Sequence, residues 1–216
     1  DSLGTMRAFI GKVRNDNGID FDTDLFVAEI PLDVEITTSY SGSQTEYPRP
    51  PQGIKIRRLT NGLKVSGIVR GSYDGKTIAF TALDKNNVKQ IFVTKADGTQ
   101  KNPQKITSFN SDCNSVRWHP NNNYLFFVSE GNIYIASIFS DKENKIFKLT
   151  DDNLERTQLV VSHDGKRLAY VIATQTRDSE TELVKDAVGN DYKQIFIMEI
   201  IWEKINSSFI NLSEIS

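Results

Sequence analysis

The chain has 216 residues, 38% of them hydrophobic and 25% charged, with a formal net charge of −2. This composition is typical of a globular protein that buries a sizeable core without a disulfide or a structural metal. Acidic and basic residues are intermixed, and the longest basic cluster is only Lys55, Arg57 and Arg58, which argues against a nucleic-acid partner.

The single cysteine and the lengths of the apolar runs exclude further classes of protein. The one cysteine, Cys113, excludes an internal disulfide and a zinc site with several cysteines, and we expect it to be a half-buried apolar side chain. No apolar run reaches the ~18–20 residues that a membrane span requires. The opening residues, DSLGTMRAFI, show neither the charged nor the apolar region of a signal peptide.

In chain order, the first predicted strands are residues 6–11 (MRAFIG) and 24–30 (DLFVAEI). They resemble two later segments, TIAFTA at 77–82 and QIFVTKA at 90–96, which indicates a repeating unit that begins in its middle.

Three acidic residues alternate just before the second of these strands. Asp20, Asp22 and Asp24 are spaced like the start of a calcium-binding loop, but an EF-hand would need Gly and Glu where Leu25 and Pro31 stand. We therefore expect an acidic loop between strands and no metal.

Residues 33–53, DVEITTSYSGSQTEYPRPPQG, form a polar insertion with three prolines. Aromatic side chains beside pre-ordered prolines make a plausible contact surface, so Tyr40, Tyr47 and Arg49 are the candidate partner-binding residues. The alternative is an ordinary surface loop.

Residues 65–107 read as one complete unit of four short strands. SGIVRG is followed by an Asp74-Gly75 hairpin turn in which the glycine takes the positive-φ position, then by TIAFTAL, KQIFVTK and a last strand ending at KIT. The two middle strands are apolar on both faces, as expected for a sheet stacked between two others.

The unit recurs along the chain. The turn segments 72–76, 119–123 and 162–166 follow one another at offsets of 47 and 43 residues. The dipeptides Leu59-Thr60, Ile106-Thr107 and Leu149-Thr150 keep the same two offsets. We expect units at about 1–60, 61–107, 108–150 and 151–216, the last closing with FINLSE at 209–214. A second insertion, 174–192, interrupts the last unit, and residues 180–188 could form a short helix.

Four-stranded units of ~40–45 residues, buried on both faces, predict an all-β fold: a β-propeller of antiparallel blades. Closed propellers use about 4–8 blades, and this chain supplies between three and four. It is therefore a segment of a larger ring, a small four-bladed ring, or one of two chains that complete a ring. An open blade would expose an apolar face and a strand edge, which predicts self-association.

Two stretches of the repeat, YDGKTIAF…QIFVTKADGTQ…KIT and SHDGKRLAY…QIFIMEI, resemble the TolB-like β-propeller repeat, whose consensus runs roughly S-P-D-G-K-x-I-A-F…I-Y-V-x-x-x-D-G…R-L-T. This likeness covers most of residues 65–200. RAFIGKVRN…DLFVAEIP, YPRPPQGIKIRRLT and VRWHPNNNYLFFVSEGNIYIASI extend it over about 6–172, toward the later blades of an uncharacterised bacterial family of TolB-like proteins.

That family carries further blades before the matching region and has no established activity, so the resemblance implies a C-terminal portion of a larger propeller. It favours a periplasmic or secreted location, with the cytoplasm as the alternative. Asn121-Asn122 stand where the consensus has Asp-Gly, and nothing matches the N-terminal α/β domain of TolB. TolB's partners in the cell envelope are therefore not implied.

Few residues suggest catalysis. Asp74 and Asp164 repeat at blade spacing and are expected to be turn formers. The two histidines, His119 and His163, occupy adjacent, not equivalent, turn positions in neighbouring units, which favours packing or turn roles over a metal site or a catalytic dyad. Neither a nucleophile elbow nor a phosphate-binding glycine motif occurs.

The sequence therefore predicts a non-catalytic binding scaffold with no catalytic residue, cofactor or metal. Its partner would be a protein, a small ligand or a glycan, bound at the propeller rim or channel. The alternative is a propeller-class enzyme, a glycan lyase or hydrolase relative with its site at the central channel.

Overall fold

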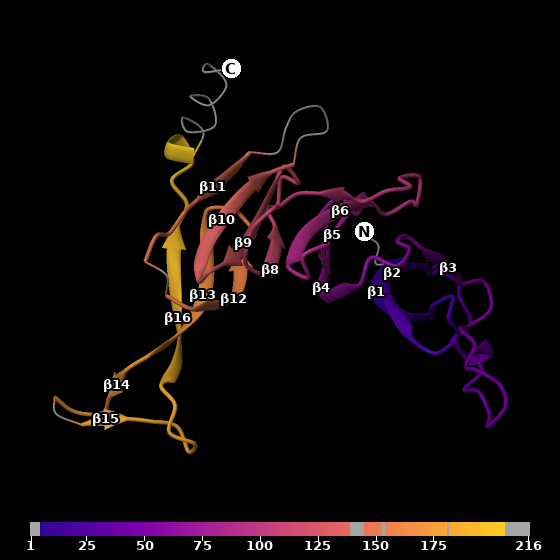
Figure 1. Cartoon of the computed structure of the whole chain (residues 1–216), viewed down its shortest axis with the longest axis horizontal. Coiled ribbons are helices and arrows are strands. Elements are labelled where there is room, and N and C mark those ends of the chain that lie inside the picture. Colours follow the sequence, from indigo (N-terminus) through magenta and orange to yellow (C-terminus); the bar gives the residue numbers. More distant parts are fainter. Residues whose placement is uncertain (1–4, 139–144, 153, 181, 206–216) are drawn as a thin grey trace. The chain divides into compact units, whose positions relative to one another are not determined.

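The computed structural model describes residues 5–138, 145–152, 154–180 and 182–205. It is built almost entirely from short β-strands (Figure 1). By its contacts the chain divides into two compact units, residues 1–87 with 91–105 and residues 88–90 with 106–216. The predicted closing segment at 209–214 lies outside the described residues.

Four antiparallel sheets follow one another along the sequence, and each is a meander; in the last of them the two-stranded sheet β14-β15 is inserted between two neighbouring strands. Blade 1 is β1-β2-β3, blade 2 is β4-β5-β6-β7, blade 3 is β8-β9-β10-β11 and blade 4 is β12-β13-β16. By sequence, β1, β2 and β3 correspond to the second, third and fourth strands of blade 2, and we number the strands of blade 1 accordingly. Strands β12, β13 and β16 correspond to the first three. The strands of blade 1 are β1 (Met6–Arg14), β2 (Phe21–Glu29) and β3 (Lys55–Arg58). Those of blade 2 are β4 (Val65–Gly71), β5 (Thr77–Leu83), β6 (Lys89–Lys95) and β7 (Gln104–Lys105), and those of blade 3 are β8 (Cys113–Trp118), β9 (Tyr124–Ser129), β10 (Asn132–Ser137) and β11 (Ile146–Lys148). Those of blade 4 are β12 (Arg156–Val161), β13 (Arg167–Thr174) and β16 (Tyr192–Glu199). This confirms the predicted antiparallel propeller blades.

The turn between the first two strands is built the same way in blades 2 and 4 and is varied in blade 3, where His119 stands at the serine position. In blade 2 the Ser72 hydroxyl donates to the Asp74 carboxylate (2.6 Å) and accepts from the Thr77 N–H (3.0 Å). Ser162, Asp164 and Arg167 repeat these bonds in blade 4. In blade 3 Asn121 replaces the aspartate and Asn122 takes the positive-φ position of the glycine, with φ 64°.

A second repeated feature joins the Leu-Thr dipeptide to the start of the third strand. In blade 1 the buried Asp24 carboxylate accepts from the Thr60 hydroxyl (2.6 Å), which in turn accepts from the Leu25 N–H (2.9 Å). The side-chain oxygens of Gln90 and Asn132 accept from Thr107 (2.8 Å) and Thr150 (3.3 Å) in the same way. We call this arrangement the threonine clasp.

The clasp also captures the backbone beyond the threonine. Asp24 accepts from the Gly62 N–H (3.1 Å), Gln90 from the Phe109 N–H (3.0 Å) and Asn132 from the Asp152 N–H (3.2 Å). In each case the donor lies two residues after the threonine, so one side chain fixes the path out of the fourth strand. Buried polar groups satisfied in this way hold one geometry.

The first strand of blades 2, 3 and 4 carries a β-bulge at a fixed place. Its pairing slips between Ser66 and Arg70 in β4, and β8 and β12 slip at the corresponding points. The third residue of each strand, Gly67, Ser115 or Gln158, has φ between 54° and 74°. Such a bulge bends the strand and raises its twist.

An aromatic pair joins the second and third strands of every blade. Ring centroids lie 5.5–6.1 Å apart and the planes meet at 12–19°, in a stacked arrangement. The four pairs are Phe9–Phe26, Phe80–Phe92, Phe127–Tyr134 and Tyr170–Phe196.

Apolar side chains pack from blade to blade within each unit. In the first unit, Leu25 and Val27 of blade 1 share a buried cluster with Val65, Ile78 and Phe80 of blade 2. In the second unit, a buried cluster joins blade 3 to blade 4 through Ile133, Ile135, Leu159, Val161 and Leu168. The middle strands of blades 2 and 3 are buried on both faces, as predicted.

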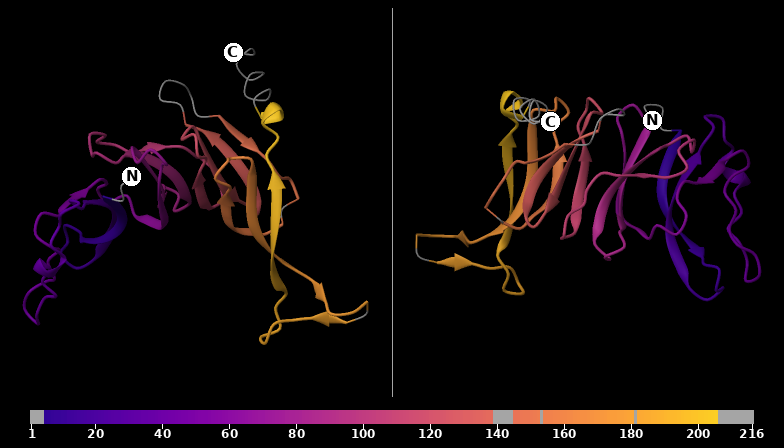
Figure 2. Two further views of the ribbon diagram at one scale, coloured as in Figure 1. Left: turned by 180° about the vertical axis from the view of Figure 1, so that it is seen from behind. Right: turned by 45° about the horizontal axis from the view of Figure 1, so that its top comes forward.

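The insertion at 174–192 is a strand hairpin. It carries β14 (Thr176–Arg177) paired with β15 (Leu183–Val184) and leaves blade 4 between β13 and β16 (Figure 2). The short helix expected at 180–188 is wrong for the described part of this segment, because residues 183–184 pair as a strand and Asp186–Gly189 form a hydrogen-bonded turn.

Replacing Gly165 with alanine should destabilise the second unit strongly. Its φ of 69° already costs alanine about 1–2 kcal/mol. A Cβ would also lie 2.0 Å from His119 Nε2, so the buried ring must move and lose its hydrogen bonds, and we expect a total loss of roughly 3 kcal/mol. The matched control is Gly189→Ala, where φ is 87° and nothing lies within 4 Å. Urea unfolding that gave equal losses for both variants would contradict the contact.

The buried Asp24 should contribute to stability through its charge. Burial alone would raise its pKa, but hydrogen bonds from Thr60, Gly62, Arg58 and Leu63 outweigh it and lower the pKa. Asp24→Asn should therefore lose about 2–4 kcal/mol at neutral pH. The control Glu29→Gln, in a half-exposed pair with Arg57, should lose less than about 1 kcal/mol.

The same carboxylate predicts a pH dependence. Because the folded-state pKa lies below the unfolded value of 3.8, the stabilisation is complete above that value and disappears as the pH falls through the folded pKa. Wild type and Asp24→Asn should converge in free energy of unfolding in strong acid. A difference that stayed constant down to the lowest measurable pH would contradict the assignment.

Candidate functional site

The insertion between β2 and β3 is an ordered structure. Its 3₁₀ turn η1 (Ile36–Thr38) is capped by Glu35, whose carboxylate accepts from the Thr37 N–H and hydroxyl. The Gln52 N–H donates to the Thr38 hydroxyl at 2.8 Å, which ties the far end of the insertion back to this turn.

Two of the three predicted contact residues lie together here. Tyr40 and Arg49 form a small antiparallel bridge with backbone bonds of 3.0 and 2.8 Å, and the guanidinium carbon of Arg49 lies 5.0 Å from the Tyr40 ring centroid. Glu46 also pairs with Arg49, at 3.4 Å. These contacts close the segment 40–49 into a hairpin, which we call the Tyr40–Arg49 hairpin.

The third predicted residue, Tyr47, lies in this hairpin and is 87% exposed. The turn that carries it depends on Gly42, which has φ of 89° and whose Cβ would approach Glu46 O and Pro48 N at 2.9 Å. Leu32 and Ile36 are also exposed, at 79% and 72%. The insertion therefore presents three large apolar side chains to solvent from a hydrogen-bonded frame.

The turn between β15 and β16 is held by polar contacts. Lys185 pairs with Asp191 at 2.5 Å, and Asp186 accepts from the backbone N–H groups of Val188 and Asn190. Those backbone bonds lower the pKa of Asp186, with the Asn190 N–H as the largest cause. Val188 is 81% exposed in this turn.

His119 is a structural residue. It is buried, its Nδ1 accepts from the Asn121 N–H (3.2 Å), and its Nε2 lies 3.2 Å from the Gly165 carbonyl. With Nδ1 accepting, Nε2 carries the proton and donates. Both ring nitrogens are therefore occupied in packing the blade 3 turn on the blade 4 turn, whereas His163 is exposed.

The predicted acidic loop at 20–24 is wrong for Asp22, whereas Asp24 lies in a strand as the prediction for 24–30 requires. Asp22 and Asp24 lie inside β2, because the strand begins at Phe21, and Asp24 is the buried clasp residue. Asp20 accepts from the Asn17 side chain in the preceding turn. Over the described ranges, no three His, Cys, Asp or Glu side chains are grouped closely enough to hold a metal.

The recurring aspartates serve the turns. For Asp74, burial opposes ionisation, but bonds from the Ser72 hydroxyl and the Lys76 N–H lower its pKa. For Asp164, the Ser162 hydroxyl is the largest cause of a lowered pKa, followed by the Lys166 N–H. Neither is a proton donor near neutral pH. Cys113, expected half-buried, is fully buried.

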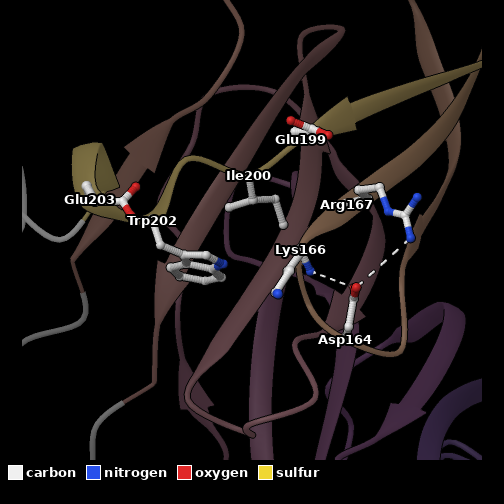
Figure 3. Close-up of a pocket in the computed structure, with 7 residues that line it drawn as sticks. All are labelled: Asp164, Lys166, Arg167, Glu199, Ile200, Trp202 and Glu203. Carbon is white, nitrogen blue, oxygen red and sulfur yellow. Dashed lines mark hydrogen bonds and ion pairs between the residues drawn. The ribbon is translucent and has the colours of Figure 1, made fainter.

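An open pocket lies beside the blade 4 turn (Figure 3). It has a volume of about 470 Å³ and is lined by Asp164, Lys166, Arg167, Glu199, Ile200, Trp202 and Glu203. Trp202 Nε1 donates to the Gly165 carbonyl at 3.3 Å, and its ring meets His119 edge-on. The lining offers charges of both signs and one aromatic wall, but no hydroxyl, thiol or imidazole nucleophile.

Sequence reasoning did not single out Trp202. It follows the last recognisable strand motif and has no counterpart in the other repeats, so the repeat gave no signal for it. No helix within the described part of the chain is long and apolar enough to cross a membrane.

Comparisons with known proteins agree with this architecture. No family model matches the sequence. The chain is 28% identical over 190 residues to the uncharacterised protein YidR of Escherichia coli (strain K12), a match that covers 81% of this chain and 45% of that protein. The chain thus spans less than half the length of this curated relative.

Three solved structures are similar. TolB from Acinetobacter baumannii matches 92% of this chain and 39% of its own, at 16% identity and a TM-score of 0.55. A putative TolB from Agrobacterium tumefaciens matches 92% and 58%, at 14% identity and a TM-score of 0.54. The tricorn protease matches 91% and 17%, at 15% identity and a TM-score of 0.56. Such low identities show a shared fold only. The chain therefore has a TolB-like β-propeller fold and a sequence similar to that of an uncharacterised bacterial protein.

Proposed function

We propose that this chain is a non-catalytic scaffold that binds a protein partner through the Tyr40–Arg49 hairpin of blade 1. The observation that carries the proposal is Tyr47, which is 87% exposed on a hydrogen-bonded turn. Tyrosine and arginine are enriched in protein interfaces, and exposed apolar groups on an ordered frame mark contact surfaces.

The hairpin's order matters for affinity. A loop that must be fixed on binding loses conformational entropy, whereas a pre-ordered loop has already lost it. Here the Tyr40–Arg49 bridge, the Gly42 turn and the Gln52–Thr38 bond hold the segment before any partner arrives. Tyrosine adds a large contact area with few rotatable bonds.

The charges near Tyr47 suggest the partner's chemistry. The Arg49 guanidinium lies over the Tyr40 ring and pairs with the Glu46 carboxylate. In this ion pair the Arg49 side chain is 70% exposed and the Glu46 side chain is 59% exposed. An acidic side chain on the partner could replace Glu46 as the ligand of Arg49 while an apolar group covers Tyr47. We therefore propose a protein surface with an apolar contact flanked by a carboxylate.

A photo-crosslinking amino acid placed at Tyr47 should capture one discrete partner in cells. The matched control is Tyr73, an exposed tyrosine of the blade 2 turn, from which we expect no such product. Identical products from both positions, or none from Tyr47, would contradict the proposal. Turnover of a glycan or peptide substrate by the purified chain would contradict its non-catalytic part.

Loosening the hairpin should weaken binding without removing any contact side chain. With the partner captured at Tyr47, Gly42→Ala should raise its dissociation constant by about tenfold, because ~1–2 kcal/mol of φ strain opposes the ordered turn. Gly18→Ala is the control, with φ of 71° and nothing within 4 Å, and should bind like wild type. Equal affinity of the Gly42 variant and wild type would show that pre-ordering plays no part.

A further inference from the structure

The third strand of each blade carries the same short apolar motif: LFV in β2, IFV in β6, IYI in β10 and IFI in β16. The solvent exposure of its first and third side chains differs between blades. Leu25 and Val27 in β2, Ile91 and Val93 in β6, and Ile133 and Ile135 in β10 are all at most 4% exposed. Ile195 and Ile197 occupy the same positions in β16 and are 75% and 69% exposed. Blade 4 therefore presents an apolar face that its sequence equivalents bury.

The covered copies show what this face accepts. Leu25 and Val27 pack with Val65 of the first strand and Ile78 and Phe80 of the second strand of the following blade. In the second unit, Ile133 and Ile135 pack against the first two strands of blade 4. By analogy, the surface that would pack on the Ile195–Ile197 face is the opposite face of another blade, the one that carries a stacked aromatic pair. We call this the leading face of a blade.

One such leading face is open in this chain. Phe9 corresponds to Phe80, since each stacks on the aromatic residue of its third strand. Phe80 is fully buried, whereas Phe9 is 37% exposed and the neighbouring Ile56 is 51% exposed. Blade 1 thus offers the partner surface that blade 4 lacks.

The charges on the two faces are complementary. Because side chains alternate along a strand, Arg7 lies on the Phe9 face of β1 and Glu199 on the Ile197 face of β16. Both are exposed. Stacking the two faces as blades stack elsewhere in the chain would bring an arginine toward a glutamate at one edge.

We propose that the chain self-associates head to tail, with the Ile195–Ile197 face of blade 4 packed on the Phe9–Phe26 face of blade 1 in a second copy. Two copies that contact each other at both of these faces would supply eight blades, which is within the range of about 4–8 for closed propellers.

Sedimentation velocity over a wide range of protein concentration tests the proposal. Wild type should form a dimer, and Ile195→Asp should weaken it by at least about tenfold, because an interface anchor is replaced by a charge that must be desolvated. Val188→Asp, which adds the same charge at an 81% exposed site off this face, should dimerise like wild type. A monomer at every concentration overturns the proposal and indicates that another chain covers the face.

A charge exchange tests the pairing and uses only exposed side chains. Arg7→Glu and Glu199→Arg should each weaken dimerisation, and the double variant should recover most of the lost affinity.

Head-to-tail contact also predicts that an Ile195→Asp copy, with its blade 1 face intact, binds an Arg7→Glu copy through one contact. A dimer that is insensitive to Arg7→Glu but lost in Ile195→Asp would instead be a symmetric β16–β16 contact and would overturn the proposal. Because none of these residues lies in the Tyr40–Arg49 hairpin, failure here leaves the proposed partner site untouched.

Discussion

The structure depends on the packing of one blade's third strand against the first two strands of the next. Leu25 and Val27 meet Ile78 and Phe80 in this way, and Ile133 and Ile135 meet Leu159 and Leu168. Each contact buries apolar side chains on both partners, at about 25 cal/mol per Å² of apolar surface removed from water. No blade can bury both of its faces alone, so stability and association are governed by the same surfaces.

Besides this packing, polar side chains hold the turns and the strand ends of the blades. Equivalent positions keep the same role in different blades even where the residue type differs. The clasp uses a carboxylate in Asp24, and amides in Gln90 and Asn132, because each offers an oxygen that accepts from a threonine hydroxyl and a backbone N–H. The positive-φ turn position is held by Gly165 in blade 4 and by Asn122 in blade 3. Asparagine tolerates this region better than other side chains.

Much of the architecture could be predicted from the sequence, because strand period, turn residues and unit spacing are local signals. The Asp-Gly turns and the strands that are apolar on both faces predict the propeller blades, and the recurrence of the turn predicts the structural role of Asp74. The bulges could not be predicted, since Gly67, Ser115 and Gln158 share no residue type. The sequence does not predict that Asp22 lies inside a strand, because alternating carboxylates are also typical of loops. The helix expected at 180–188 is wrong because Leu183 and Val184 pair with β14 as strand β15 and Asp186–Gly189 form a turn. Tyr40 and Arg49 were chosen by composition, but only the fold shows that they pair.

Hydrogen–deuterium exchange of the third strands tests the dependence on blade packing most directly. Amides of β10 should exchange slowly, because Ile133 and Ile135 are covered. Amides of β16 should exchange much faster at low protein concentration, where Ile195 and Ile197 face solvent, and should slow as the concentration rises. If β16 were protected as well as β10 in the dilute monomer, neighbour packing would not be what stabilises these strands, and the account would be contradicted.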